Sequence, residues 1–207
     1  MGKIELKKEL KHLYDPSSTE VSVVDVPAFN FLMVDGAGDP NNSQEFQDAM
    51  DAVFSVSYTL KFMVKKGKTA VDYAVMPPEG LWWTGDMAEF NMEDKDSWLW
   101  TVMIMQPPVL TRELVAEAVA QVEKKKNPPA LSKLRFESYR EGLSAQIMHL
   151  GPFSAEGPTI KRLHDFIREN GYELAGKHHE IYLSDVRRIT PEKWKTVIRQ
   201  PVKQRVR

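Results

Sequence analysis

The 207-residue chain contains no cysteine. This absence excludes disulfide bonds, a thiolate nucleophile and any zinc site built on cysteine. No stretch approaches the roughly 18 to 20 uncharged residues that a membrane-spanning helix needs. The first ten residues lack the apolar core of a secretory signal. We therefore expect a cytoplasmic protein.

Several chemistry-bearing motifs are also absent. The sequence has no Gly-x-x-x-x-Gly-Lys-Ser/Thr phosphate loop, no Gly-x-Gly-x-x-Gly dinucleotide fingerprint and no Gly-x-Ser-x-Gly nucleophile elbow. His178 and His179 are adjacent and would point to opposite faces of a strand, so they cannot chelate one ion together. His149 and His164 have no partner at metal-ligand spacing. We expect neither a metal nor a cofactor.

The charge is balanced overall but uneven along the chain. The net charge is −1, while residues 1–120 carry ten Lys and Arg against nineteen Asp and Glu, and residues 121–207 carry eighteen against ten. The two halves could complement each other within one fold or one dimer, or the second half could present a nucleic-acid surface. We favour the first alternative, because the isoelectric point is about 6.5 and no DNA-binding motif is present.

Hydrophobic periodicity predicts an α+β fold. In the first half we expect a strand interrupted at Pro27, a helix capped by Asn42 and ended by Gly67, and two strands joined by a connection that carries Trp82 and Trp83. Their ranges are 21–34 for the first strand, about 42–66 for the helix, 71–75 and 98–104 for the two later strands, and 79–85 for the connection.

A helix over about residues 111–126 follows, and then the pattern restarts. The second half shows two strand-like runs around a Glu141-Gly142 turn, a helix that begins near Pro158 and ends at Asn170-Gly171, and two further strands; the runs are 134–139, 143–150, 180–183 and 194–202. We therefore expect one domain over residues 1–207, built from two tandem strand-helix-strand-strand repeats, about 20–108 and 134–203. A pseudo-two-fold axis would relate the repeats around a shared ligand groove.

Aromatic residues are the first candidates for ligand contact, because flat apolar side chains suit planar organic molecules. Trp82 and Trp83 are adjacent, Trp98 and Trp100 share one strand face, and Tyr73 is on a nearby strand. The alternative is that these rings are core residues, and we favour that alternative for Trp98 and Trp100.

The second candidate is the run from His178 to Leu183. On a strand, His178, Glu180 and Tyr182 share one face, while His179, Ile181 and Leu183 share the other. A carboxylate in an aromatic groove is poorly solvated, which raises its pKa toward the range useful for general acid or base work. The alternative is an ordinary exposed glutamate.

Three segments, 32–41, 76–83 and 179–188, resemble stand-alone GyrI-like small-molecule-binding proteins. The resemblance covers nearly the whole chain; Val186 stands where this group often has proline. Relatives of this fold serve as multidrug-binding parts of transcription regulators, in which an acidic residue meets hydrophobic cations. The stand-alone branch includes hydrolases that open the cyclopropane ring of DNA-alkylating cyclopropanoid compounds.

The resemblance implies a hydrolase of cyclopropanoid compounds with a planar aromatic small-molecule ligand and no cofactor. A non-catalytic protein that binds or sequesters planar or cationic hydrophobic drugs is the alternative. Glu180 is the best match for a catalytic residue. The other expected site residues are Tyr73 and Tyr182 as catalytic tyrosines, and Trp82, Trp83, Trp100, Tyr139 and His178 as substrate contacts.

Overall fold

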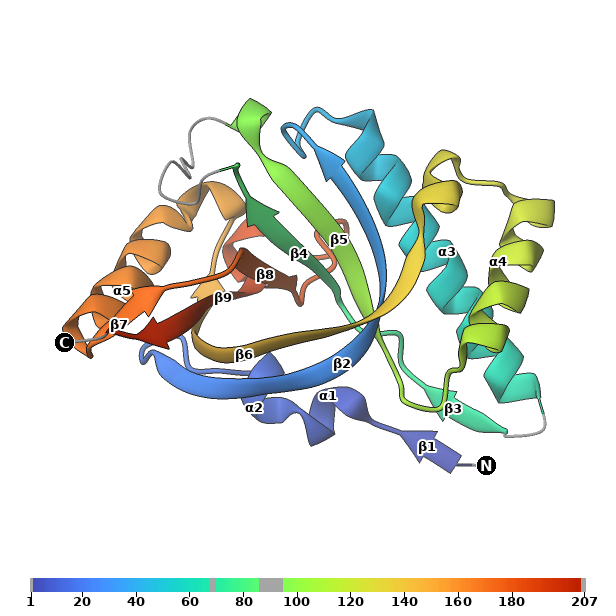
Figure 1. The fold of residues 1–207 in the computed structure, drawn as a ribbon, viewed down its shortest axis with the longest axis horizontal. Coiled ribbons are helices and arrows are strands. Elements are labelled where there is room, and N and C mark those ends of the chain that lie inside the picture. Colours follow the sequence, from blue (N-terminus) through green and yellow to red (C-terminus); the bar gives the residue numbers. More distant parts are fainter. Residues whose placement is uncertain (1, 68–69, 86–94, 206–207) are drawn as a thin grey trace. The chain divides into compact units, whose positions relative to one another are not determined.

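A computed structural model describes residues 2–67, 70–85 and 95–205 of the chain (Figure 1). The residues divide into two compact units. Unit 1 comprises residues 1–9 and 29–139, and unit 2 comprises residues 10–28 and 140–207. No helix within the described residues is long and apolar enough to cross a membrane.

Unit 1 contains strands, α-helices and short 3-10 helices. Its strands are β1 (Gly2–Ile4), the second part of β2 (Ser22–Ala37), β3 (Val71–Tyr73), β4 (Pro78–Trp83), β5 (Leu99–Gln106) and the first residues of β6 (Arg135–Leu150). Its helices are α1 (Leu6–Glu9), α3 (Gln44–Lys66), η2 (Lys95–Ser97), α4 (Arg112–Lys125) and η3 (Pro129–Lys133).

Antiparallel pairing of β5 with both β2 and β4 forms the sheet of unit 1. Ile104 lies opposite Leu32 on one side and Pro78 on the other, so β5 is central among these three strands. Helix α3 packs on β5 and lies beside α4 (Figure 1). Their contact encloses an apolar cluster that includes Leu60, Val64, Ala118 and Val122, which are all at most 3% exposed.

Unit 2 repeats the same order of elements. It contains α2 (Lys11–Tyr14), the first residues of β2, most of β6, η4 (Phe153–Ala155), α5 (Gly157–Glu169), β7 (Tyr172–Leu174), β8 (His178–Tyr182), η5 (Pro191–Lys193) and β9 (Lys195–Gln204). Strand β9 pairs antiparallel with β6, β8 and β7. Helix α5 packs on β7 and β9, and its Leu163 and Ile167 are fully buried.

The predicted α+β class and the strand-helix-strand-strand order are confirmed. In unit 1 the order is β2, α3, β4 and β5, and in unit 2 it is β6, α5, β8 and β9, with short β3 and β7 as additions. The predicted ends of α3 and α4 are nearly correct. The cap of α3 is Ser43, whose hydroxyl accepts from Phe46 N–H, and not Asn42.

Three local predictions are wrong. Strand β2 continues past Pro27, which is exposed, and through Gly36 to Ala37 instead of ending at residue 34. Gly36 lies under the indole of Trp100, where an added Cβ would come within 2.1 Å of the ring. The two runs around Glu141 form one strand, β6, because Gly142 takes a φ of +78° within it instead of closing a hairpin.

The connection that was expected to carry Trp82 and Trp83 is also a strand. Residues Pro78–Trp83 form β4, in register with β5, so that Trp82 lies opposite Trp100. Pro78 is tolerated because it is the first residue of the strand. Gly80 leaves room for the Trp82 indole, whose Nε1 would be 2.8 Å from a Cβ at that position. Both tryptophans are therefore presented by a strand and not by a loop.

Candidate functional site

The carboxylate of Glu180 is the centre of a hydrogen-bonded group on β8. Tyr182 donates its hydroxyl proton to Glu180 Oε2 at 2.7 Å, and His178 Nε2 lies 3.2 Å from Glu180 Oε1. Glu180 is 6% exposed and His178 is 2% exposed. The three side chains share one face of the strand, as the alternation predicts. Glu180 is thus a buried, oriented hydrogen-bond acceptor.

Two aromatic rings that the sequence analysis left without a role adjoin Tyr182. The ring centroid of Phe153, in η4, lies 5.4 Å from that of Tyr182 in an edge-on arrangement. The ring of Trp194, between η5 and β9, lies 4.9 Å from Phe153. Phe153 is 38% exposed despite its apolar ring. Residues 153, 182 and 194 are far apart in the sequence and come together only in the folded chain. Their spacing therefore does not predict this contact.

The opposite face of β8 carries a second, fully buried charged group. His179 Nδ1 lies 2.9 Å from Glu141 Oε1, and Arg199 donates to Glu141 Oε2 at 3.1 Å. The three side chains are 2% exposed. Burial alone raises the pKa of the Glu141 carboxyl, but the charges and hydrogen bonds of His179 and Arg199 outweigh it and hold that pKa at about 2.

This charged cluster also holds the N-terminal segment of unit 2. Arg199 donates through Nε to Gln146 Oε1 at 2.9 Å and through Nη2 to the Leu13 carbonyl at 2.6 Å. Gln146 in turn donates to the His12 carbonyl at 2.7 Å. The carbonyl groups of α2 are therefore satisfied by side chains from β6 and β9. Glu141 was not predicted to be a buried charged residue, because the Glu141-Gly142 pair was interpreted as a turn.

His164 lies on α5 near His178. Its Nε2 is buried and has no hydrogen-bond partner among the described residues. Burial, and to a smaller extent the interactions with His178 and Arg168, lower the pKa of His164 to about 4 against the opposing effect of Asp165. The imidazole is consequently neutral near pH 7 and adds no positive charge beside the Glu180 group.

The predicted tryptophans lie in an aromatic cluster of unit 1. Trp82 stacks on Phe46 with centroids 5.8 Å apart, and Trp100 meets the same ring edge-on at 5.2 Å. Trp82 is 2% exposed and Trp100 is fully buried. Trp98 lies 5.4 Å from Trp82 and is 4% exposed. These contacts are typical of core residues, and ligand contact at Trp82 and Trp100 stays a prediction.

Three other predicted residues also lie in unit 1. Trp83 is half-buried at the end of β4, and Tyr139 is half-buried with its ring edge-on to Phe31 at 6.3 Å. Tyr73 is 3% exposed in the apolar cluster between α3 and α4. Burial raises the pKa of its phenol, whose oxygen has no hydrogen-bond partner among the described residues. Ligand contact at these residues stays a prediction.

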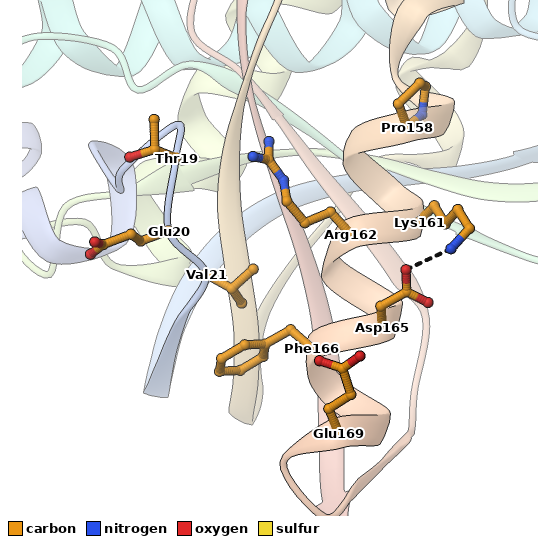
Figure 2. Close-up of a pocket in the computed structure, with 9 residues that line it drawn as sticks. All are labelled: Thr19, Glu20, Val21, Pro158, Lys161, Arg162, Asp165, Phe166 and Glu169. Carbon is orange, nitrogen blue, oxygen red and sulfur yellow. Dashed lines mark hydrogen bonds and ion pairs between the residues drawn. The ribbon is translucent and has the colours of Figure 1, made fainter.

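A surface hollow of about 630 Å³ lies between α5 and residues 19–21 in unit 2 (Figure 2). Arg162 and Phe166 project from α5 toward that segment, and Arg162 donates to the Ser18 carbonyl at 3.2 Å. Lys161 is paired with Asp165. None of the predicted site residues lines this hollow. It is therefore separate from the Glu180 group.

No three His, Asp or Glu side chains in the described ranges come together in a way that could hold a metal ion. The Glu180 group offers a buried carboxylate, the Tyr182 hydroxyl bound to it, and the exposed ring of Phe153. This combination suits an uncharged or cationic organic molecule with a flat apolar frame.

A family model for the GyrI-like small molecule binding domain matches residues 19–203. The chain belongs to this family. No curated protein matches the sequence. A conserved protein of undefined function from Listeria innocua is 40% identical to this GyrI-like chain, with a TM-score of 0.89, and the alignment covers 97% of this chain and 100% of that protein.

Two structures named as hydrolases, also from Listeria innocua, are similar to this GyrI-like chain over the same extent, 97% of this chain and 100% of theirs. They are 38% and 40% identical, with TM-scores of 0.84 and 0.86. The family and the α+β fold of the chain are thus established, and small-molecule binding is the activity that the family description carries.

Proposed function

We propose that this GyrI-like protein is a hydrolase that opens the cyclopropane ring of cyclopropanoid DNA-alkylating compounds by adding water. The observation that carries the proposal is the buried carboxylate of Glu180, which accepts a hydrogen bond from Tyr182 beside the exposed ring of Phe153. Relatives that are named hydrolases and are 38 and 40% identical support it.

The reaction needs one acceptor for a proton of water. In a cyclopropanoid, the strained ring is conjugated to a dienone carbonyl. The water oxygen bonds to the unsubstituted ring carbon, the carbon–carbon bond of the cyclopropane breaks, and its electron pair moves to the carbonyl oxygen, giving a phenol after protonation. The net change is the addition of one water. Glu180 would take the proton that the attacking water loses.

The geometry around Glu180 fits this role. An ionised carboxylate has about four acceptor positions. Tyr182 uses one on Oε2, and the tautomer of His178 with its proton on Nε2 uses one on Oε1. These two contacts fix the orientation of the carboxylate. We assign Tyr182 and His178 as positioning residues in this scheme. Proton donation to the developing oxyanion by Tyr73 stays a prediction.

The alternative is a protein that binds or sequesters planar or cationic hydrophobic ligands without chemistry. The family description favours it directly, because it specifies binding alone. A buried carboxylate close to aromatic rings would also attract an organic cation.

Mass spectrometry of a cyclopropapyrroloindolone incubated with the protein separates the two functions. Hydrolysis gives a product heavier by one water, whereas sequestration gives saturable binding and an unchanged compound. We expect Glu180→Gln to lower the hydrolysis rate by about 100-fold or more, because it removes the proton acceptor and keeps the side-chain shape.

The matched control is Glu173→Gln. Glu173 is on β7, where it pairs with Lys203 and Arg205 at the surface, and its side chain is 41% exposed. This variant should turn over the compound at the wild-type rate. Equal rates in the wild type and Glu180→Gln would contradict the proposed role of the carboxylate.

A further inference from the structure

We infer that Phe153, supported by Trp194, forms a binding wall for the flat ring system of the ligand and determines which ligand sizes the protein accepts. The ligand class assumed for this wall is taken from the proposed function, so this inference rests on it. It assigns ligand contact to two residues of unit 2 that neither the sequence motifs nor the family description single out.

Phe153 is placed where a ligand contact is needed. Its ring meets Tyr182 at 5.4 Å between centroids, and the Tyr182 hydroxyl donates to Glu180 at 2.7 Å. A molecule whose reacting group approaches Glu180 past Tyr182 therefore meets Phe153 next. Phe153 is 38% exposed, and stacking on a flat ligand would remove much of that apolar surface from water.

The wall is also built rigidly. The Gly151 N–H donates to the Trp194 carbonyl at 3.0 Å, and the Trp194 indole N–H donates to the Ile189 carbonyl at 2.8 Å. His149 holds the turn before Phe153, with its Nε2 3.2 Å from the Pro152 carbonyl. These hydrogen bonds hold the backbone just before Phe153 and the indole of Trp194. Both rings are therefore mounted on a fixed frame, which lowers the conformational entropy lost when a ligand stacks on them.

The indole of Trp194 completes the surface. Its ring lies 4.9 Å from Phe153 at an interplanar angle of 42°. Together the two rings present a wider apolar area than either alone, which favours fused polycyclic frames over single rings. By contrast, Phe62, which is 50% exposed, lies on α3 in unit 1.

The test compares two probes with the same reactive group. One is a bare spirocyclopropyl cyclohexadienone, and the other is a cyclopropapyrroloindolone, which embeds that group in a flat tricyclic frame. For Phe153→Ala we expect about a tenfold rise in KM for the tricyclic probe, because one aromatic stacking contact is lost. The KM of the bare probe should rise by clearly less, because that probe lacks the flat frame that stacks on Phe153. Phe153→Leu should fall between Phe153→Ala and the wild type, and the control Phe62→Ala should match the wild type.

Binding is measured separately with the ring-opened phenol of the tricyclic probe, which cannot react. We expect its Kd to rise about tenfold in Phe153→Ala, and the tryptophan quenching it causes to decrease in Trp194→Phe. If the wild type hydrolyses neither probe but binds the phenol in a Phe153-dependent way, the proposed hydrolysis fails and the wall stands.

The wall itself is overturned if folded Phe153→Ala and Phe153→Leu both bind the phenol as tightly as the wild type. An equal loss of turnover for both probes overturns it as well, because that result means that the substitution displaces Glu180 instead of removing a ligand contact.

Discussion

The buried cluster of Glu141, His179 and Arg199 makes a quantitative prediction about stability. We consider the substitution Glu141→Gln, which keeps the size of the side chain and removes its charge. Arg199 and His179 would then remain at 2% exposure without a carboxylate. Removing one partner of a buried ion pair costs about 3 to 5 kcal/mol, because the remaining charge is neither solvated nor compensated.

For a chain of this length, each kcal/mol shifts the melting temperature by about 2 to 4 °C, so the expected decrease is about 6 to 20 °C. Thermal unfolding at pH 7, followed by far-ultraviolet circular dichroism, measures it. Glu173→Gln is the matched control, since its surface ion pairs are worth about 0 to 1 kcal/mol.

The pH dependence tests the same cluster independently. The pKa of Glu141 is about 2 in the folded protein against an ordinary value of 4.5. Its contribution to the free energy of unfolding is therefore complete above about pH 4.5 and is lost as the pH falls toward 2. The shift corresponds to roughly 3 kcal/mol. Glu141→Gln should lose this part of the acid sensitivity. A variant that melts within a degree of the wild type at pH 7 would refute the reasoning.

Two further predictions concern packing and acidification. Gly36→Ala should lower the free energy of unfolding by at least about 1 to 3 kcal/mol in urea titrations, because its Cβ would overlap the Trp100 ring, whereas Gly85→Ala, with open space around the Cβ, should change it by less than about 0.5 kcal/mol. His164 has a folded pKa of about 4, below its ordinary value of 6.5, so stability should fall by roughly 2 kcal/mol between pH 6.5 and pH 4. His164→Leu should reduce this decrease, and an unchanged pH profile in that variant would contradict the assignment.

The sequence was informative where one period of hydrophobicity dominated. Apolar residues at helical spacing, among them the buried Leu163 and Ile167, predicted α5. The alternation from His178 to Tyr182 placed three polar side chains on one face of β8. It was misleading at glycine and proline. Gly36 and Gly80 were placed outside the predicted strands, although both lie in strands, where an indole ring packs directly over them.

The parts of the candidate site that the sequence could not predict depend on contacts between distant residues. Phe153 and Trp194 are 41 positions apart and meet through a backbone hydrogen bond between Gly151 and Trp194. Glu141 and His179 are likewise separated by 38 positions. Neither pair has a local signal, because its members meet only through the tertiary fold.

Strand β8 combines two consecutive residues with opposite tasks, since His179 belongs to the buried ion cluster and Glu180 to the proposed chemistry. Deleting a single residue from the segment before β8 would slide the strand by one position and turn every one of its side chains to the opposite face. The Glu180 carboxylate would then face Arg199 and Glu141, and the apolar side chain of Ile181 would take its former place. Insertions and deletions there should therefore be far less tolerable than substitutions, which gives a simple criterion for choosing where a mutational library can vary chain length.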